Sequence, residues 1–422
     1  MAQPEYIDLI EKNVKKSVTY YYHPDVGNFH YGPRHPMKPQ RLAACNNLVV
    51  HYGLHNQMEM RLSPKANKAD MIRFHSPDYI SFLERINPRC AKQNESYFPQ
   101  FNIGEDCPVF DGIFEFCSIY SGASIEGAIR LNHKAADIVI NWSGGLHHAK
   151  KAEASGFCYV NDIVLAILEL LKYHKRVLYI DIDIHHGDGV QEAFELTDRV
   201  MTVSFHKYGS MFFPGTGNMY DIGHDQGRFF SVNVPLGGGI EDPDYLFLFK
   251  PVIEEVIQNY QPEAIVLQCG SDSLGCDRLG NFNLSFDGHA ECVRFVRDLG
   301  LPMLVLGGGG YTLRNVARCW ANETGVLLGT RLDNVIPKDS EYLSFFGPDY
   351  TLRPELNKRL DNQNTPEFLD AIKFDVIQNL RRVRTAPSVA MQPIADDYFD
   401  KEEALRSPEI GDDERQMDID DS

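Results

Sequence analysis

The chain has 422 residues, with 59 acidic and 41 basic side chains and a formal net charge of −18. This acidity argues against direct, sequence-specific DNA binding by the protein's own surface, because nucleic acid attracts positive charge. With 43% hydrophobic and 24% charged residues, the composition excludes a fibrous or fully disordered chain. The acidity is uneven, since residues 396–422 hold 12 acidic and 3 basic side chains. We therefore expect residues 395–422 to form an acidic, disordered tail.

The first residues and the cysteines indicate an intracellular protein without a membrane segment. The N-terminal sequence contains no long apolar core typical of a signal peptide, and no apolar run is long enough to span a membrane. The nine cysteines are scattered and lack C-x-x-C spacing, which favours free thiols in a reducing compartment. The basic run RRVR at residues 381–384 fits either a nuclear import signal or the solvated face of a helix.

Short β-branched runs that end in polar or glycine-rich turns predict the buried strands of a parallel sheet. These runs are Ile138–Trp142, Val177–Ile184, Val200–Phe205, Ala264–Cys269 and Leu304–Leu306. Between them, Asp162–Lys175 predicts a helix with Asn161 as its N-cap. Alternating strands and helices predict one α/β domain over residues 18–394, with helices on both faces of a mainly parallel sheet. Residues 1–17 precede it as an N-terminal extension.

The second predicted strand carries two carboxylates and an imidazole. Because strand side chains alternate between faces, Asp181, Asp183 and His185 share one face. Burying them together requires compensation, and oxygen and nitrogen donors without thiolates suit Zn²⁺ or another first-row divalent ion. Asp272, which follows a later strand, is a possible third ligand. Taken alone, an aspartate there more commonly caps a turn, so this assignment depends on the rest of the pattern. An edge strand with solvated carboxylates is the alternative to a metal site.

Two further strand ends supply candidate catalytic groups. The run SGGLHHAKK places His147 and His148 directly after two glycines, where both rings can reach one cavity. Such a pair can take a proton from water at a metal and return it to a leaving group, unless the two are ordinary loop histidines. Asp181 and Asp188 are available to orient the rings. The run GGGGYT lets Tyr311 donate to a developing oxyanion at the metal, unless this tyrosine is only a packed aromatic.

Five segments in this order resemble the class I zinc-dependent histone deacetylases: GGLHHAK, YIDIDIHHGDGVQEAF, FPGTG, LQCGSDSLGCDRLG and LGGGGYTLRNVARCW. The likeness extends over about residues 18–390, and HPMKPQR and YGSMFFPGTGNMYDIG are most similar to the corepressor-associated type. The resemblance implies an arginase/deacetylase-like α/β domain that hydrolyses N6-acetyl-lysine on histones and other proteins. It further implies acetylated histone tails and nuclear-receptor-type corepressor proteins as partners, transcriptional repression as the outcome, and a nuclear location with some protein in the cytoplasm.

The same resemblance implies a role for each residue at the strand ends. The zinc ligands correspond to Asp183, His185 and Asp272. The general base and acid corresponds to His148, and its electrostatic partner corresponds to His147. The acceptors that hold the rings of His147 and His148 correspond to Asp181 and Asp188, respectively. The tyrosine that polarises the acetyl carbonyl corresponds to Tyr311.

Three binding sites are also implied by the resemblance. An apolar passage for the lysine stem matches Gly156, Phe157, Phe213 and Leu279, with Asp106 as a rim carboxylate that favours a basic histone tail. One potassium site matches Asp181, Asp183, His185, Ser204 and Phe205, and part of a second matches Phe194, Thr197 and Val200. A basic pocket for an inositol phosphate, a regulatory ligand, matches His30, Lys38, Arg278 and Arg314. Arg34 stands in this pocket where relatives carry a small residue, so it either adds a phosphate contact or crowds the site.

Two other functions deserve comparison with protein deacetylation. A small-molecule amidohydrolase of the same fold could act on acetylated polyamines, but a cationic substrate favours an acidic gatekeeper and Leu279 is apolar. A catalytically silent scaffold would lack a zinc ligand, His148 or Tyr311, and all of these positions are filled as the chemistry demands.

Overall fold

The structure is a computed structural model that describes residues 16–209, 211–383 and 391. The acidic tail predicted at residues 395–422, most of the extension at 1–17 and Arg384 of the basic run lie outside the described residues. The boundaries of the catalytic domain therefore stay predictions.

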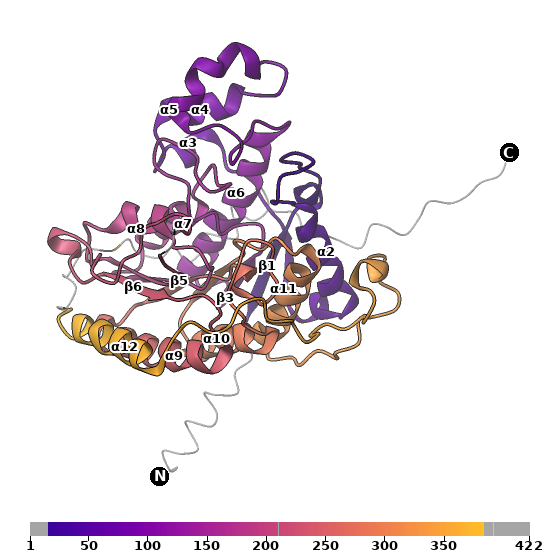
Figure 1. Ribbon diagram of the computed structural model, residues 1–422. Helices are drawn as coiled ribbons and strands as arrows, with labels where there is room; N and C mark the ends of the chain where they lie inside the picture. Colours follow the sequence, from indigo (N-terminus) through magenta and orange to yellow (C-terminus); the bar gives the residue numbers. More distant parts are fainter. Residues whose placement is uncertain (1–15, 210, 384–390, 392–422) are drawn as a thin grey trace, which may run out of the picture.

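One sheet of eight parallel strands organises the described residues, in the order β2-β1-β3-β8-β7-β4-β5-β6 (Figure 1). The strands are β1 Val18–Tyr22, β2 Glu59–Leu62, β3 Ile138–Asn141, β4 Val177–Asp181, β5 Val200–Lys207, β6 Ser231–Leu236, β7 Ala264–Gln268 and β8 Met303–Leu306. This confirms the predicted parallel α/β fold. The strands β1, β2 and β6 were not predicted; β2 has the sequence EMRL at the sheet edge and offers no apolar run.

Helices cover both faces of the sheet, as predicted. Figure 1 shows α9, α10 and α12 along one face and α7 and α8 on the opposite side, while α3, α4 and α5 form a lobe that projects from the sheet. The helices are α2 Gln40–His51, α3 Lys68–Met71, α4 Pro77–Arg85, α5 Phe98–Phe101, α6 Ile113–Asn132, α7 Asp162–Leu170, α8 Asp188–Phe194, α9 Asp242–Tyr260, α10 Phe286–Asp298, α11 Leu313–Leu327 and α12 Pro366–Leu380.

Alternate residues of each strand enter different halves of the core. In β4, Val177 and Tyr179 pack with α7, whereas Leu178 and Ile180 belong to the larger cluster on the other face. All four side chains are at most 1% exposed. Burying a large apolar side chain contributes about 1.5–3 kcal/mol, so a sheet that is apolar on both faces is held firmly between its helices.

The predicted helix at residues 162–175 is shorter than expected. Its start is as predicted, because the Asn161 side chain accepts a hydrogen bond from Val164 N at 3.1 Å, a cap that contributes about 1 kcal/mol. The prediction of an end at Lys175 is wrong, since α7 ends at Leu170. The turn that follows is held by the Arg199 guanidinium, which donates to the carbonyl oxygens of Leu171 and His174 at 2.8 and 3.0 Å.

The strand predicted over residues 177–184 is also too long, because β4 ends at Asp181. Ile182 N still donates to Gln268 O of β7 at 3.1 Å, but carboxylates accept the next three backbone N–H groups. Asp183 N donates to Asp181 at 3.1 Å, Ile184 N to Asp272 at 2.9 Å and His185 N to Asp183 at 3.0 Å. The polar side chains that end the strand thus also fix the shape of the segment that follows it.

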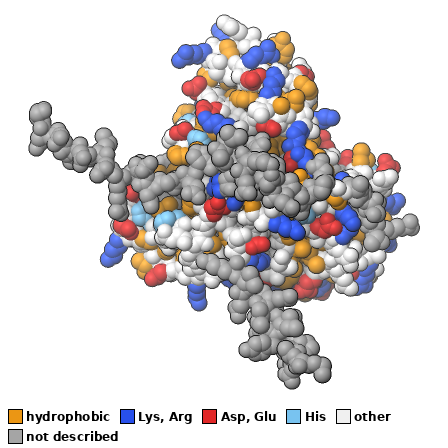
Figure 2. All heavy atoms as spheres, turned by 180° about the vertical axis from the view of Figure 1, so that it is seen from behind, with side chains coloured by type: hydrophobic (Ala, Val, Ile, Leu, Met, Phe, Trp, Pro, Cys, Tyr) orange, Lys and Arg blue, Asp and Glu red, His pale blue; other side chains and the backbone are white. Residues whose placement is uncertain are grey.

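The surface carries charges of both signs. On the face seen in Figure 2, lysine and arginine side chains are interspersed with aspartate and glutamate wherever described residues are visible. Within residues 16–209 and 211–383, no helix has both the length and the apolar character needed to cross a membrane.

Candidate active site

Four neighbouring strands in the middle of the sheet end at the candidate active site. They are β3, β8, β7 and β4, which lie side by side in this order. The segments that leave them carry every candidate metal-ligating and catalytic residue named above. Because parallel strands present their carboxyl ends at one edge, residues separated by more than 160 positions in the sequence come together there.

Asp183, His185 and Asp272, called the ligand trio below, lie together at this edge. Each offers one ligand atom, and these atoms are all within 4.8 Å of one another. The His185 Nδ1 atom is 3.1 Å from a carboxylate oxygen of Asp183 and 3.1 Å from one of Asp272. Both aspartates are fully buried and His185 is 8% exposed. The structure therefore brings together the three residues expected to bind zinc.

The charge balance of the ligand trio fits a cation. Burial and the neighbouring Asp183 carboxylate raise the pKa of Asp272 to about 7, because two buried like charges repel. The donor set of two carboxylates and one imidazole, without a thiolate, suits Zn²⁺ among the divalent ions. Burial lowers the pKa of His185, but the Asp272 and Asp183 carboxylates outweigh burial and raise it to about 10, so the protonated imidazole balances only one of the two carboxylates. A divalent ion would balance both.

The adjacent histidines each contact a different carboxylate. His147 Nδ1 lies 2.7 Å from Asp181, and His148 Nδ1 lies 2.7 Å from Asp188. The two imidazole rings are 3.9 Å apart, and the His148 ring is 5.9 Å from that of His185. Both rings therefore stand beside the ligand trio, each with the orienting acceptor expected for it.

The two histidines differ in protonation. Burial lowers the pKa of His147, but the Asp181 and Asp183 carboxylates outweigh burial and raise the pKa to about 9. Burial and the charge of His147 instead lower the pKa of His148 to about 3, despite its contact with Asp188. At neutral pH, His147 is thus positively charged and His148 is neutral.

Three supporting residues escaped the sequence analysis. Gln268 donates to Asp183 at 2.9 Å, Tyr179 donates to Asp181 at 2.5 Å, and the Lys150 ammonium lies 2.7 Å from Asp188. All three stand inside the motifs that identify the strand ends, but neither spacing nor residue type indicates which way they face. The structure shows that each of these carboxylates is held from a second side.

Tyr311 lies in the turn after β8 and is 8% exposed. Its backbone N donates to the Asp277 carboxylate at 2.8 Å, and its ring stands edge-on to Phe157 with 5.7 Å between centroids. Arg41, which the sequence analysis did not single out, donates to the carbonyl oxygens of Gly308 and Gly310, both at 2.6 Å. Burial and the Asp272 carboxylate raise the pKa of Tyr311 well above its usual value, so its hydroxyl stays protonated.

The residues expected to line the passage surround the histidines and Tyr311. The Phe213 ring is 4.9 Å from His148, and Phe213 is 42% exposed, so it connects the site with the surface. Gly156 leaves room for both, because a Cβ atom there would lie 2.5 Å from His148 and 2.9 Å from Phe213. Asp106 and Leu279 line a hollow of about 750 Å³ together with Phe157.

The residues of the expected potassium sites lie on β4, β5 and their flanks. The strand register places Asp181 opposite Ser204, which precedes Phe205. Asp183 and His185 follow Asp181 closely in the chain. The second set, Phe194, Thr197 and Val200, runs from the end of α8 to the start of β5, and Thr197 N donates to Phe194 O at 3.1 Å.

The residues of the expected inositol phosphate pocket are mostly exposed. These are His30, Arg34, Arg278 and Arg314, whereas Lys38 is partly buried and donates to the carbonyl oxygens of Gly32 and Pro33 at 2.7 and 3.0 Å. Arg34 lines the same hollow as Asp106 and Leu279. The structure thus places Arg34 beside residues that are expected to form the passage for the lysine stem. Arg314 donates to Gly347 O at 3.2 Å.

Comparison with known proteins identifies the family. The model of the histone deacetylase domain matches residues 35–327. This chain belongs to the histone deacetylases. It is 56% identical to histone deacetylase B of Dictyostelium discoideum over 406 residues, which cover 94% of this chain and 96% of the relative. It is also 54% identical to histone deacetylase 9 of Arabidopsis thaliana over 410 residues, covering 96% and 95% of the two chains.

A third relative agrees with this assignment. The chain is 58% identical over 396 residues to a protein named putative histone deacetylase 2 of Caenorhabditis elegans, covering 94% of this chain and 78% of the relative. The protein is therefore an enzyme of the class I histone deacetylase type, a hydrolase that acts on acetyl-lysine, as the sequence resemblance predicted. The family is generally metal-dependent, and the ligand trio supplies a suitable metal-binding group.

Proposed function

We propose that this histone deacetylase uses zinc, held by Asp183, His185 and Asp272, to remove acetyl groups from lysine side chains of histones and other proteins. The observation that carries this proposal is the meeting of the ligand trio with two oriented histidines at adjacent strand ends. When bound, zinc supplies Lewis acidity for the acetyl carbonyl and makes water a better nucleophile.

The protonation difference between the histidines assigns their roles. Neutral His148 donates from Nδ1 to Asp188, which leaves its Nε2 free to accept a proton from the attacking water. The same nitrogen then protonates the lysine amine as the C–N bond breaks. His147 keeps its positive charge, held by Asp181, next to the negative charge that develops on the acetyl group. The protonated hydroxyl of Tyr311 donates to the acetyl oxygen.

The passage explains why an acetyl-lysine side chain suits this site. Its aromatic walls, Phe157 and Phe213, accept a thin methylene stem, while the Asp106 carboxylate at the rim attracts a basic histone tail. Leu279 contributes an apolar rim instead of an acidic gatekeeper, which disfavours free polyamines.

Turnover of an acetylated histone H4 peptide by the purified full chain tests the proposal. We expect turnover that a strong chelator abolishes and added zinc restores, and less turnover of acetylated spermidine than of the peptide. Zinc-independent turnover would contradict the metal assignment, and a zinc-loaded chain without turnover would be a scaffold.

We further propose that the chain works in the nucleus within a nuclear-receptor-type corepressor complex, with an inositol phosphate between the two proteins. The support is the set of basic residues His30, Arg34, Lys38, Arg278 and Arg314, all exposed except the partly buried Lys38, on a protein whose net charge is −18. Arg34 extends this set toward the substrate mouth. Potassium ions would bind at the two expected potassium sites, the one that includes Asp181 and the one that includes Val200. The basic run RRVR would serve nuclear import.

Replacing Arg278 and Arg314 with alanine tests the basic pocket. Two lost charge-assisted contacts of about 1.5–3 kcal/mol each predict inositol hexakisphosphate binding weakened at least tenfold in a calorimetric titration. Replacing Arg331, an exposed arginine in a different hollow, is the matched control and should leave binding unchanged. If the double variant and the control bound inositol hexakisphosphate equally well, the basic pocket would not be the binding site.

A further inference from the structure

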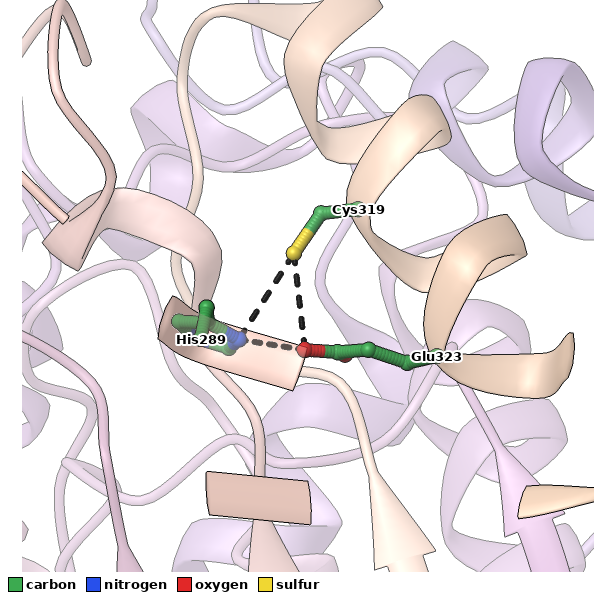
Figure 3. Close-up of side chains that lie close together, drawn as sticks. All are labelled: His289, Cys319 and Glu323. Atoms are coloured by element: carbon green, nitrogen blue, oxygen red, sulfur yellow. Dashed lines mark hydrogen bonds and ion pairs between the residues drawn. The ribbon is translucent and has the colours of Figure 1, made fainter. Parts of the chain in front are cut away.

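A second group of potential metal ligands lies behind the active site. His289 of α10 and Cys319 and Glu323 of α11, called the buried trio below, point toward one another in Figure 3. The Cys319 Sγ atom is 3.6 Å from His289 Nδ1 and 3.6 Å from Glu323 Oε1, and His289 Nδ1 contacts Glu323 Oε1 directly. Each of the three residues is at most 1% exposed.

A proton, rather than a metal ion, accounts for the contacts of the buried trio. The short contact between His289 and Glu323 is a charge-assisted hydrogen bond, and it fills the space that a metal ion would need between the two atoms. Burial lowers the pKa of His289, but the Glu323 carboxylate outweighs burial and raises it. The imidazolium and the carboxylate therefore compensate each other's charge without any further ion.

The other side of the His289 ring points to the active site. Its Nε2 atom donates to the carbonyl oxygen of Gly270 at 3.0 Å. Gly270 lies in the turn that carries Asp272, and a Cβ atom on it would stand only 2.0 Å from an Asp183 carboxylate oxygen. The carbonyl of Cys269 is held in the same way, by Trp320 Nε1 at 2.8 Å. Buried donors from α10 and α11 thus hold two consecutive carbonyls of this turn.

We infer that His289, held by Glu323, is a positioning residue that sets the separation of Asp183 and Asp272 through the Gly270 carbonyl and thereby tunes the affinity of the ligand trio for zinc. The inference rests on the proposed zinc site. His289 touches neither the ligand atoms nor the substrate passage, so its effect is transmitted through one backbone carbonyl. Groups that orient metal ligands in this indirect way change metal affinity or activity by about 10- to 100-fold when they are removed.

Two replacements of nearly equal size separate positioning from general stability. In H289Q, the amide nitrogen can occupy the place of Nε2 and still donate to Gly270. In H289N, the shorter amide reaches Glu323 but not Gly270. We expect the zinc affinity of H289N, measured by competition with a chromogenic chelator, to fall about 10- to 100-fold, and that of H289Q to stay within about threefold of the original.

Thermal unfolding of the metal-free chains and a control at Cys292 complete the test. Cys292 is a buried α10 residue whose thiol donates to Gly288 O and does not contact the turn, so C292A should change the unfolding midpoint but not the zinc affinity. Equal zinc affinity of H289N and H289Q would overturn the inference. If C292A lowered both the unfolding midpoint and the zinc affinity, the inference would also be overturned. The effect of His289 on zinc affinity would then be an effect of stability alone.

A measurement on the unsubstituted chain covers the case in which H289N does not fold. Zinc addition should shift the ring ¹⁵N resonance of His289, assigned as the signal absent from H289Q, although this ring does not touch the metal. An unshifted resonance in a zinc-loaded chain would contradict the coupling. D272N distinguishes failure of this inference from failure of the proposed function. If the proposed zinc site were wrong, D272N would bind zinc as tightly as the original chain.

Discussion

The ligand trio and the buried trio meet the same geometric requirement, since both bring three potential ligand atoms within 4.8 Å. They differ in charge balance. The ligand trio has two carboxylates and one imidazole, and repulsion from Asp183 together with burial raises the pKa of Asp272 to about 7. The buried trio has one carboxylate and one imidazole, which compensate each other. An unbalanced negative charge, rather than the number of ligand atoms, therefore distinguishes a metal site from a structural cluster.

The two trios also differ in how close they lie to the protein surface. The ligand trio includes His185, the most exposed residue of the two groups at 8%, whose ring stacks on Phe212 at 5.1 Å and lies near the exposed Phe213. The buried trio is sealed between α10 and α11. The proposed metal ion and substrate can therefore meet at the ligand trio, whereas the proposed effect of the buried trio passes through the backbone that it holds.

The largest expected effect follows from breaking the charge pattern of the ligand trio. In D272N, a neutral amide replaces one carboxylate, so we expect loss of zinc and a fall in kcat/KM of about 10³-fold or more, because metal stabilisation of several kcal/mol is lost. Elemental analysis and peptide turnover measure the two effects. Turnover near the original value in a zinc-free D272N chain would show that the trio is not the catalytic metal site.

Replacing Tyr311 with phenylalanine should separate metal binding from catalysis. Loss of one donor to the developing oxyanion predicts a fall in kcat of about 10²–10³-fold, with zinc still bound. Tyr245 offers a matched control, because its buried hydroxyl has no hydrogen-bond partner among the described residues. Y245F should therefore turn over peptide at the original rate. Similar rates for Y311F and Y245F would remove the proposed role of Tyr311.

The contrast between the two active-site histidines predicts a pH effect. The positive charge of His147 depresses the pKa of His148, so H147Q should raise the pKa of His148 toward its usual value. Because His148 must be neutral to accept a proton, the acidic limb of the kcat/KM profile should move to higher pH by about one unit or more. D181N should shift this limb in the same direction, since it weakens the charge on His147. An unchanged acidic limb in both variants would refute the assignment.

The smallest expected effect on turnover belongs to the buried trio. C319A removes a buried thiol and should cost about 1–3 kcal/mol of unfolding free energy, measured by urea denaturation. Because Cys319 does not touch the Gly270 turn, we expect turnover within about twofold of the original. A loss of turnover comparable to that of D272N would mean that the buried trio has a direct part in catalysis.

The sequence predicted the centre of the fold better than its periphery. The strands β3, β4, β5, β7 and β8 are apolar runs that end in polar turns, and their carboxyl ends placed the ligand trio and the histidines correctly at one edge. Strand ends were predicted less well, because carboxylates that take backbone N–H groups terminate β4 three residues early. After α7, which also ends earlier than predicted, the turn is held by Arg199 from a later segment.

Apart from those of His147 with Asp181 and of His148 with Asp188, the contacts between distant segments stayed beyond sequence reasoning. Nothing in the motif around Gln268 indicates that its amide reaches Asp183, and His289 and Glu323 stand in ordinary amphipathic helices. Their partners are fixed only when α10 and α11 pack behind the sheet. The roles of the catalytic, potassium and inositol phosphate residues remain predictions that the experiments above address.

The zinc content of the purified chain tests the central claim most directly. After removal of loosely bound metal by gel filtration, elemental analysis should find one zinc ion per chain in the original protein and in C319A, and none in D272N. Zinc retained by D272N, or lost from C319A, would place the metal outside the ligand trio and contradict the account.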